Sequence, residues 1–138
     1  DAFGSSTGWR NRLLGLGEDE QRLNLKKEGI FPLVHGVRSL ALAHRVTETS
    51  TAGRITALVA GGHLAADMGA DLTDSLHFFM GLKLKAGLAE LDTGKPVTGA
   101  VDLARLSSLD RDLLKDTLGV VKRFKALLRH RFHLEGAR

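Results

Sequence analysis

The fold of this chain is decided by the stretch Asn24–Leu42, which reads NLKKEGIFPLVHGVRSLAL. A polar approach ends at Gly29, and Pro32 stands where we expect the first turn of a helix. Proline suits that position because the N–H group that it lacks would be unpaired there anyway. Leucine, valine and alanine then recur at helical spacing. The pattern predicts a helix from about Phe31 to His44 with one face in the core.

Four basic side chains accompany the start of this expected helix: Lys26, Lys27, His35 and Arg38. The first N–H groups of a helix are unpaired and its dipole is positive at that end, so anions are attracted there. We therefore predict that these four residues converge on a negatively charged ligand. The alternative is that the lysines are solvated loop charges, that Arg38 pairs with a surface carboxylate, and that His35 is a half-buried polar group.

Two further helices follow. The hydroxyl-rich run Thr47–Thr51 can cap a helix from about Ala52 to Ala60, which Gly61 and Gly62 end. A longer helix is predicted from about Ala66 to Leu91, roughly 40 Å in length. Its apolar residues form two rows at i, i+4 spacing, which we expect to bury more than one face. The rows are Leu72, Leu76, Met80, Leu84 and Leu88, and Phe78, Leu82 and Ala86.

The last helix is predicted to begin where Ser107 and Asp110 have capping-box spacing and to end at about Phe132. Its acidic residues lie in the first half and its basic residues in the second, which the helix dipole favours. We expect its inner face to consist of Leu109, Leu113, Leu114, Val120, Val121, Phe124, Leu127 and Leu128.

Together these patterns predict an all-α fold, an antiparallel bundle of about four helices joined by short loops. No strand-like alternation interrupts them. We assign residues 24–138 to the bundle and residues 1–23, which are rich in glycine and serine around Trp9, to a connector or N-terminal arm. Because the chain opens on Asp1 and on a linker-like stretch, we expect it to be a fragment of something longer.

Composition narrows the possible locations and partners. The chain has 138 residues, no cysteine and a net charge of +4. Without cysteine or a long apolar run, we expect a cytoplasmic protein with no membrane partner. The basic run from Lys122 to His133 lacks interleaved aromatics, so we do not expect nucleic acid as a partner. His130 and His133 lack a third ligand nearby in sequence, so we expect no metal site.

A family resemblance adds to this picture. The run Leu25–Arg38, LKKEGIFPLVHGVR, resembles the opening signature of the bacterial family named putative nucleotidyltransferase substrate-binding domain. The likeness continues through Glu48–Thr51 with Arg54, and through Leu113–Asp116 to Leu128–Phe132. More faintly, the stretch from Asn24 resembles part of the PII uridylyltransferase. Asn24 stands where the family pattern leads us to expect an acidic residue.

The resemblance implies an accessory domain that follows a catalytic domain in the parent chain, often behind cystathionine-β-synthase-type and cyclic-nucleotide-type regulatory domains. The catalytic domain would bring Mg²⁺, carboxylates and a nucleoside triphosphate. Lys26 and Arg38 would neutralise phosphate charge, and Lys27 would contribute to the binding of the same substrate. His35 would orient or shield the nucleotide. Because Gly4-Ser5 is not followed by paired aspartates, we expect no enzyme activity and no cofactor in this chain alone.

Two other functions stay open at this point. The chain can be a non-catalytic interaction module that pairs with itself as a homodimer, or with another protein, through exposed apolar residues such as Phe78 or Leu82. Alternatively, the spacings Arg38 to His44 and Arg123 to His130 fit the Arg-x(4–6)-His pattern of another helical family, the higher eukaryote and prokaryote nucleotide-binding (HEPN) domain. Some members of that family cleave RNA without metal.

Overall fold

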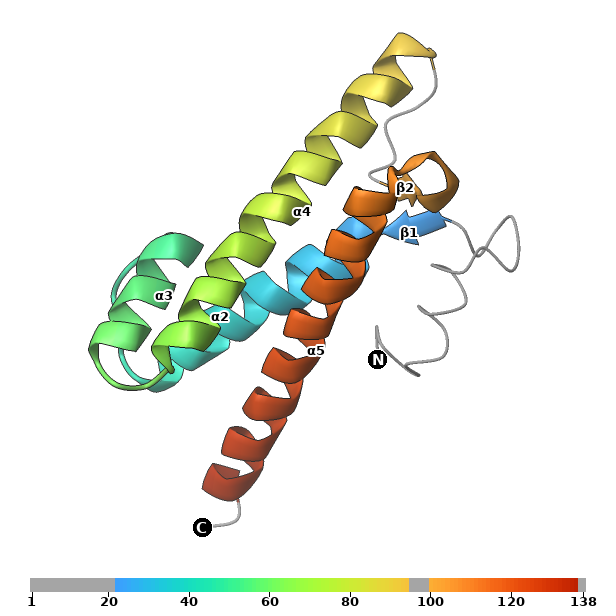
Figure 1. Ribbon diagram of the computed structural model, residues 1–138. Helices are drawn as coiled ribbons and strands as arrows, with labels where there is room; N and C mark the ends of the chain where they lie inside the picture. The colour runs from blue at the N-terminus through green and yellow to red at the C-terminus, as the bar shows by residue number, and fades with distance from the viewer. Residues whose placement is uncertain (1–21, 95–99, 137–138) are drawn as a thin grey trace.

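A computed structural model describes residues 22–94 and 100–136, and helices dominate that part of the chain (Figure 1). The all-α prediction is confirmed. The elements are β1 (Arg22–Asn24), a π-helical turn η2 (Lys26–Ile30), α2 (Phe31–Ala43), α3 (Thr51–Ala60), α4 (Ala66–Asp92), β2 (Ala100–Asp102), a 3-10 turn η3 (Leu103–Arg105) and α5 (Ser108–Gly136). Among the described residues, no helix combines the length and the apolar composition needed to cross a bilayer.

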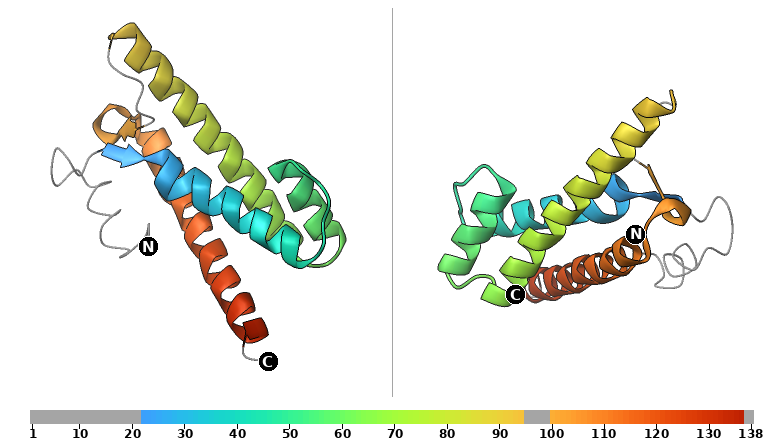
Figure 2. Two further views of the ribbon diagram at one scale, coloured as in Figure 1. Left: turned by 180° about the vertical axis from the view of Figure 1, so that it is seen from behind. Right: turned by 45° about the horizontal axis from the view of Figure 1, so that its top comes forward.

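The helices pack around one core. In Figure 1, α4 and α5 run in opposite directions, and Figure 2 shows α2 crossing this pair while α3 lies beside the end of α2 and the start of α4. Apolar side chains of all four helices meet where the elements cross. The most deeply buried are Leu33, Val37, Leu40, Leu58, Leu72, Phe79, Leu114, Leu118, Val121 and Phe124.

A short antiparallel pair of strands, β1 and β2, closes one end of the bundle. Leu23 lies opposite Val101, and both side chains are buried while their neighbours are more exposed. The expectation that the chain has no strand is wrong here. Each strand has three residues, too few to show a period of two in the sequence, and the pairing joins segments far apart in the chain.

The predicted helix is confirmed, because α2 begins at Phe31 with Pro32 in its first turn and is followed by His44 as its C-cap; a widened turn that the sequence did not predict precedes it. The widened turn η2 leads directly into α2, and the backbone N–H of Phe31 donates to the carbonyl of Lys26, five residues back. Pro32 explains the widening, because in a regular α-helix its ring would clash with the carbonyl of Glu28. Pro32 thus stands inside a continuous helix.

The ends of α3 agree with the sequence prediction. Ser50 Oγ accepts a hydrogen bond from the N–H of Gly53 at 3.0 Å, which supplies the expected cap. At the other end, Gly61 and Gly62 follow the last turn, and Gly62 adopts a φ of 75°. Ser107 caps α5 in the same way, accepting from the N–H of Asp110 at 3.0 Å.

The second half of α4 is covered by other elements on one side only. In both Figure 1 and Figure 2 its second half projects beyond the bundle. The predicted row of leucines begins in the core at Leu72, which is fully buried, and ends in solvent at Leu88, which is 53% exposed. Residues four apart advance by about 40° around a helix of 3.6 residues per turn, so a long i, i+4 row winds from one face to the opposite face. The expectation of two buried faces is therefore wrong.

Two predictions for single faces also need correction. Leu109 and Leu113, expected on the inner face of α5, are 68% and 41% exposed, whereas Leu114 and Leu118 are fully buried, so the inner face of this helix runs through the latter pair. Conversely, Leu82 was expected to be exposed in an interaction module, but it is buried, and Phe78 is half-buried. The exposed apolar side chains of α4 are instead Met80, Leu84, Leu88 and Leu91.

Candidate functional site

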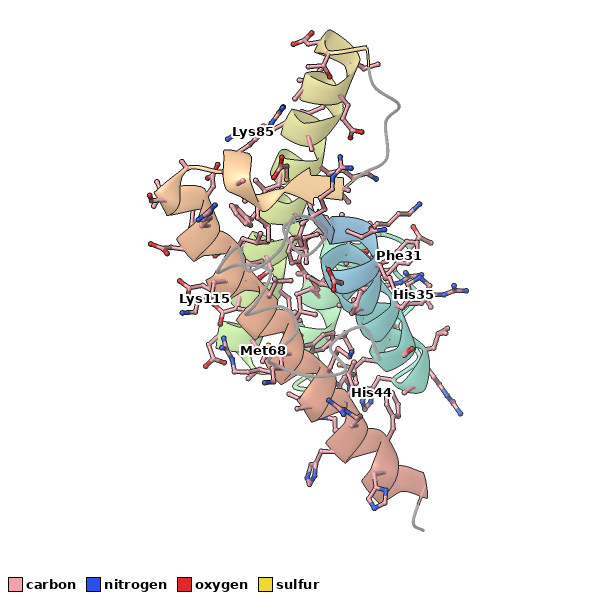
Figure 3. All side chains as sticks on the ribbon, turned by 90° about the vertical axis from the view of Figure 1, so that its right-hand side faces the viewer. Phe31, His35, His44, Met68, Lys85 and Lys115 are labelled. Atoms are coloured by element: carbon pink, nitrogen blue, oxygen red, sulfur yellow. The ribbon has the colours of Figure 1, made fainter. Side chains whose placement is uncertain are left out.

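Three of the side chains at the start of the first helix form a row on its outer face. The Lys26 Nζ atom lies 5.1 Å from the centroid of the Phe31 ring. The Phe31 and His35 rings meet edge to face, with their centroids 5.2 Å apart. Figure 3 shows Phe31 and His35 on the outer side of this helix, away from Lys115 of α5. The cation, the aromatic ring and the imidazole are therefore in sequential contact.

Arg38 continues this row. It follows His35 by three residues and Phe31 by seven, so it lies on the same face of α2, and its side chain is exposed. The two ends of the row, Lys26 and Arg38, thus share one side of the molecule. Arg38 follows Lys26 by twelve positions, which correspond to roughly 18 Å of helix axis. Lys27 is also exposed, one position along the turn.

The positive end of the helix lies at the lysines and not at His35 and Arg38. Asn24 Oδ1 accepts a hydrogen bond from the N–H of Lys27 at 3.1 Å, which is the spacing of a helix N-cap. Asn24, which replaces an expected acidic residue, therefore has a structural role. Because the dipole acts within the first turn, it favours an anion near Lys26 and Lys27. His35 and Arg38 lie further along α2, beyond that first turn.

The row carries no compensating negative charge. Within the described residues, none of the four predicted site residues forms an ion pair with a carboxylate. The nearby Glu28 is buried, with 6% of its surface exposed, so it lies inside the fold. The alternative reading of Arg38, as the partner of a surface carboxylate, finds no support in the described part of the chain.

Phe31 was not among the predicted site residues. It is 44% exposed although it is large and apolar, and it makes both contacts that hold the row together. The helical spacing of Phe31, His35 and Arg38 contained this information. The sequence prediction named Phe31 only as the first residue of the expected helix.

One member of each arginine–histidine pair of the ribonuclease alternative contacts another residue. The rings of His44 and His63 stack with their centroids 3.8 Å apart, and the Nη1 group of Arg131 donates to the carbonyl of His63. The Arg123 guanidinium lies 3.8 Å from a carboxylate oxygen of Asp71. His44 therefore belongs to a contact between helix ends, and nothing in this geometry brings it to Arg38 as a catalytic pair.

The second half of α5 gives no sign of a binding site. His130 and His133 are both exposed, and no cluster of three or more histidine or acidic side chains suited to a metal occurs among the described residues. Burial and the neighbouring Arg129 guanidinium lower the pKa of Lys125 below its ordinary value. This cationic segment therefore packs partly into the fold and does not form a uniformly exposed surface.

A cavity of about 250 Å³ lies on another part of the molecule, between the projecting half of α4, β2 and the start of α5. Its lining contains two ion pairs, Lys85 with Asp110 at 3.6 Å and Arg105 with Asp102 at 3.7 Å. None of the four predicted site residues lines it. The cavity and the basic row are thus separate features.

Comparison with known proteins identifies the family. The family described as putative nucleotidyltransferase substrate binding domain matches residues 1–132. The chain belongs to this family. No curated protein and no solved structure gives a significant match. The match to the substrate-binding domain family begins before Asn24 and so includes residues 1–23, our predicted connector, of which residues 1–21 lie outside the described residues.

The chemistry of the row agrees with a substrate-binding domain. The exposed groups are cations and an aromatic ring, which suit phosphate and a planar base. The row lacks the carboxylates that hold Mg²⁺ in nucleotide-processing sites. In this family the domain is the substrate-binding part of the enzyme and not itself the catalytic part.

Proposed function

We propose that the row formed by Lys26, Phe31, His35 and Arg38, with Lys27 beside it, binds the phosphates of a nucleotide or an anionic acceptor against a catalytic domain of the parent chain. The observation that carries this proposal is the row itself. Basic groups lie around an exposed aromatic ring on one face of one helix, with no carboxylate partner among the described residues.

Electrostatics give the row its role in the reaction. A triphosphate and the carboxylates of a catalytic domain bring a concentration of negative charge, and Mg²⁺ bound there would neutralise part of it. Lys26 and Lys27, at the positive end of a helix, lower the cost of holding the remaining phosphate charge. The domain thus contributes binding and orientation, while the transfer itself belongs to the catalytic domain.

The length of the row limits what it can hold. A single phosphate cannot contact both Lys26 and Arg38, because about 18 Å of helix axis separates their backbones. An extended nucleotide, or a nucleotide with its acceptor, can span that distance. We assign the phosphates to the lysine end, the base to the exposed side of Phe31, and the acceptor or the sugar to His35 and Arg38.

A nucleotide titration followed by amide NMR tests this function. The 138-residue chain is titrated with each of the four ribonucleoside triphosphates, and the shift changes should concentrate in residues 25–39. Replacing Lys26 or Arg38 by alanine should weaken binding about tenfold, the equivalent of ~1.4 kcal/mol. The matched control is Lys115→Ala, an exposed lysine on the opposite side of the molecule. Shift changes centred elsewhere, or an equal effect of Lys115→Ala, would contradict the proposal.

A further inference from the structure

The projecting half of α4 exposes a second apolar face. Met80, Leu84, Leu88 and Leu91 are 46%, 65%, 53% and 65% exposed. On the opposite face of the same turns, Phe79 and Leu82 are buried in the core. A helix that is apolar on two opposite faces normally has a packing partner on each of them. In the described residues the outer face has none.

This outer face has the shape of a helix-packing surface. A shallow groove of about 320 Å³ is lined by Met80, Lys83, Leu84, Gly87, Leu88 and Leu91. In helix pairs with knobs-into-holes packing, each side chain of one helix fills a hole made by residues i, i+3, i+4 and i+7 of the other. The six lining residues are the union of two successive holes of this kind, and Gly87 belongs to both.

We propose that the chain forms a two-fold symmetric dimer in which the outer faces of two α4 helices pack antiparallel. Leu84 of each copy then fills the hole over Gly87 of its partner. A two-fold axis midway between Leu84 and Gly87 also sets Met80 opposite Leu91. Leu84 thus meets the glycine, and Met80 meets the side chain at the far end of the same row.

Self-complementarity is the first reason for choosing a second copy as the occupant. A symmetric interface requires that one surface carry both the projecting side chain and the hole that receives it, at positions that the symmetry exchanges. Leu84 and Gly87 meet that requirement one turn apart. The alkyl stem of Lys83 faces Leu88 in the same register and can cover it, while its charge stays in water.

The charges of the projecting half favour the antiparallel direction. Lys83 lines the groove in its first part and Asp92 lies near its end, whereas Lys85 is paired with Asp110 and Glu90 lines the cavity on the other side of the helix. Antiparallel pairing sets the basic part of each helix against the acidic part of the other, and opposes their dipoles favourably. Parallel pairing would set like charges side by side.

The size of the surface sets the expected strength. One row of four side chains per copy buries an area at the low end of the range for specific complexes, below roughly 1,200 Å² in total. We therefore expect a dimer with a dissociation constant on the order of micromolar, or ~8 kcal/mol. This dimer does not depend on the proposed nucleotide site, because Met80 to Leu91 lie on α4 and the basic row lies on η2 and α2.

Sedimentation velocity over a range of about 1 to 500 μM tests the dimer, since that range brackets a micromolar constant. The chain should pass from monomer to dimer, and Leu84→Lys should weaken association at least tenfold. The matched control is Leu42→Lys at the end of α2, because Leu42 is also 65% exposed but lies outside the groove. Gly87→Leu should also weaken association, since it fills the hole while favouring the helix.

Several outcomes would overturn the dimer. A chain that stays monomeric at the highest concentration has no such interface. If the chain still associates after Leu84→Lys, the interface is another surface. The same conclusion follows if Leu42→Lys weakens association as much as Leu84→Lys does. If the chain is monomeric and Leu84→Lys shifts the fluorescence emission of Trp9, the single tryptophan, the groove binds the N-terminal segment of the same chain and not a second copy. Nucleotide titration of Leu84→Lys separates the two proposals, because nucleotide affinity should be unchanged.

A cross-link reads the register directly, because the chain has no cysteine of its own. Mixing a Leu84→Cys copy with a Gly87→Cys copy should give a mixed disulfide-linked dimer under mild oxidation, since the two positions face each other in the antiparallel register. Leu42→Cys mixed with either copy should not. Cross-linking of Leu84→Cys with itself in preference to the mixed pair would indicate parallel helices and contradict the proposed register.

Discussion

Gly29 lies against the ring of Phe79, so closely that a Cβ atom added to Gly29 would stand 2.6 Å from the ring carbon Cζ. This contact presses the widened turn η2 onto α4 and fixes where α2 begins relative to the core. Gly29 is buried within the opening stretch, and Phe79 is fully buried. The glycine of the LKKEG run is thus required by close packing.

Replacing Gly29 by alanine should destabilise the fold by about 2 kcal/mol, because the added methyl group must displace the Phe79 ring. The measurement is the free energy of unfolding in urea. Gly81→Ala is the matched control: Gly81 is also in a helix, and a Cβ there meets nothing within 4 Å. That change should stabilise the chain by about 0.5–1 kcal/mol. Equal effects at the two positions would contradict the contact.

Leu82 and Leu84 lie two residues apart on α4 and should respond very differently to truncation. Leu82→Ala should cost about 2–4 kcal/mol because the side chain is 3% exposed in the core. Leu84→Ala should cost less than ~0.5 kcal/mol at dilute concentration, because that side chain is 65% exposed. Urea unfolding at a few micromolar gives both values. A larger loss of stability for Leu84→Ala than for Leu82→Ala would mean that α4 is rotated about its own axis relative to this structure.

Ser50→Ala should lower stability by about 1 kcal/mol, because the cap of α3 loses the hydrogen bond to the N–H of Gly53. Thermal unfolding followed by circular dichroism measures the loss. Ser50→Asp should retain most of the stability, since its carboxylate can accept the same bond and suits the helix dipole. If the aspartate variant is as unstable as the alanine variant, the side chain of Ser50 is not a cap.

Arg131→Ala should cost roughly 1 kcal/mol, because its guanidinium donates to the carbonyl of His63 and ties α5 to the segment between α3 and α4. Lys122→Ala, an exposed cation on the same helix, should change stability by less than ~0.5 kcal/mol. Hydrogen exchange at the amides of residues 61–64 gives a local measurement. Exchange there should accelerate in the Arg131 variant alone.

Phe31→Leu tests whether the exposed ring contacts a base. The substitution keeps an apolar side chain but removes the π face, so nucleoside triphosphate affinity should fall several-fold, by about 1 kcal/mol. Affinity for inorganic triphosphate, which has no base, should change little. A parallel loss for both ligands would assign Phe31 to placing Lys26, through their 5.1 Å contact, and not to the base.

The helices could be predicted from the sequence because their causes are local. Apolar spacing, the hydroxyl cap at Ser50, the glycines after Ala60 and the cap at Ser107 act over a few residues. Even the i, i+4 row of α4 was present in the sequence. Its winding from Leu72 in the core to Leu88 in solvent was not anticipated, because which turns another element covers depends on distant segments.

The candidate site was predicted in part. Lys26, His35 and Arg38 lie on one face, as the helical spacing of the last two allowed, but the turn η2 before Phe31 was not predicted and Phe31 was assigned no role. Proline at a helix start and proline after a widened turn leave the same sequence pattern. Choosing between them requires the contact of Gly29 with Phe79, which joins residues fifty positions apart.

The sequence by itself determined the all-α class, the approximate helix ends and the basic residues of the opening stretch, since each arises from interactions within about one helical turn. Tertiary structure alone decided which faces are covered, that a widened turn precedes the helix of the opening stretch, and that residues 22–24 pair with residues 100–102. Those features depend on contacts between segments far apart in the chain, and the local propensities of the residues do not determine such contacts.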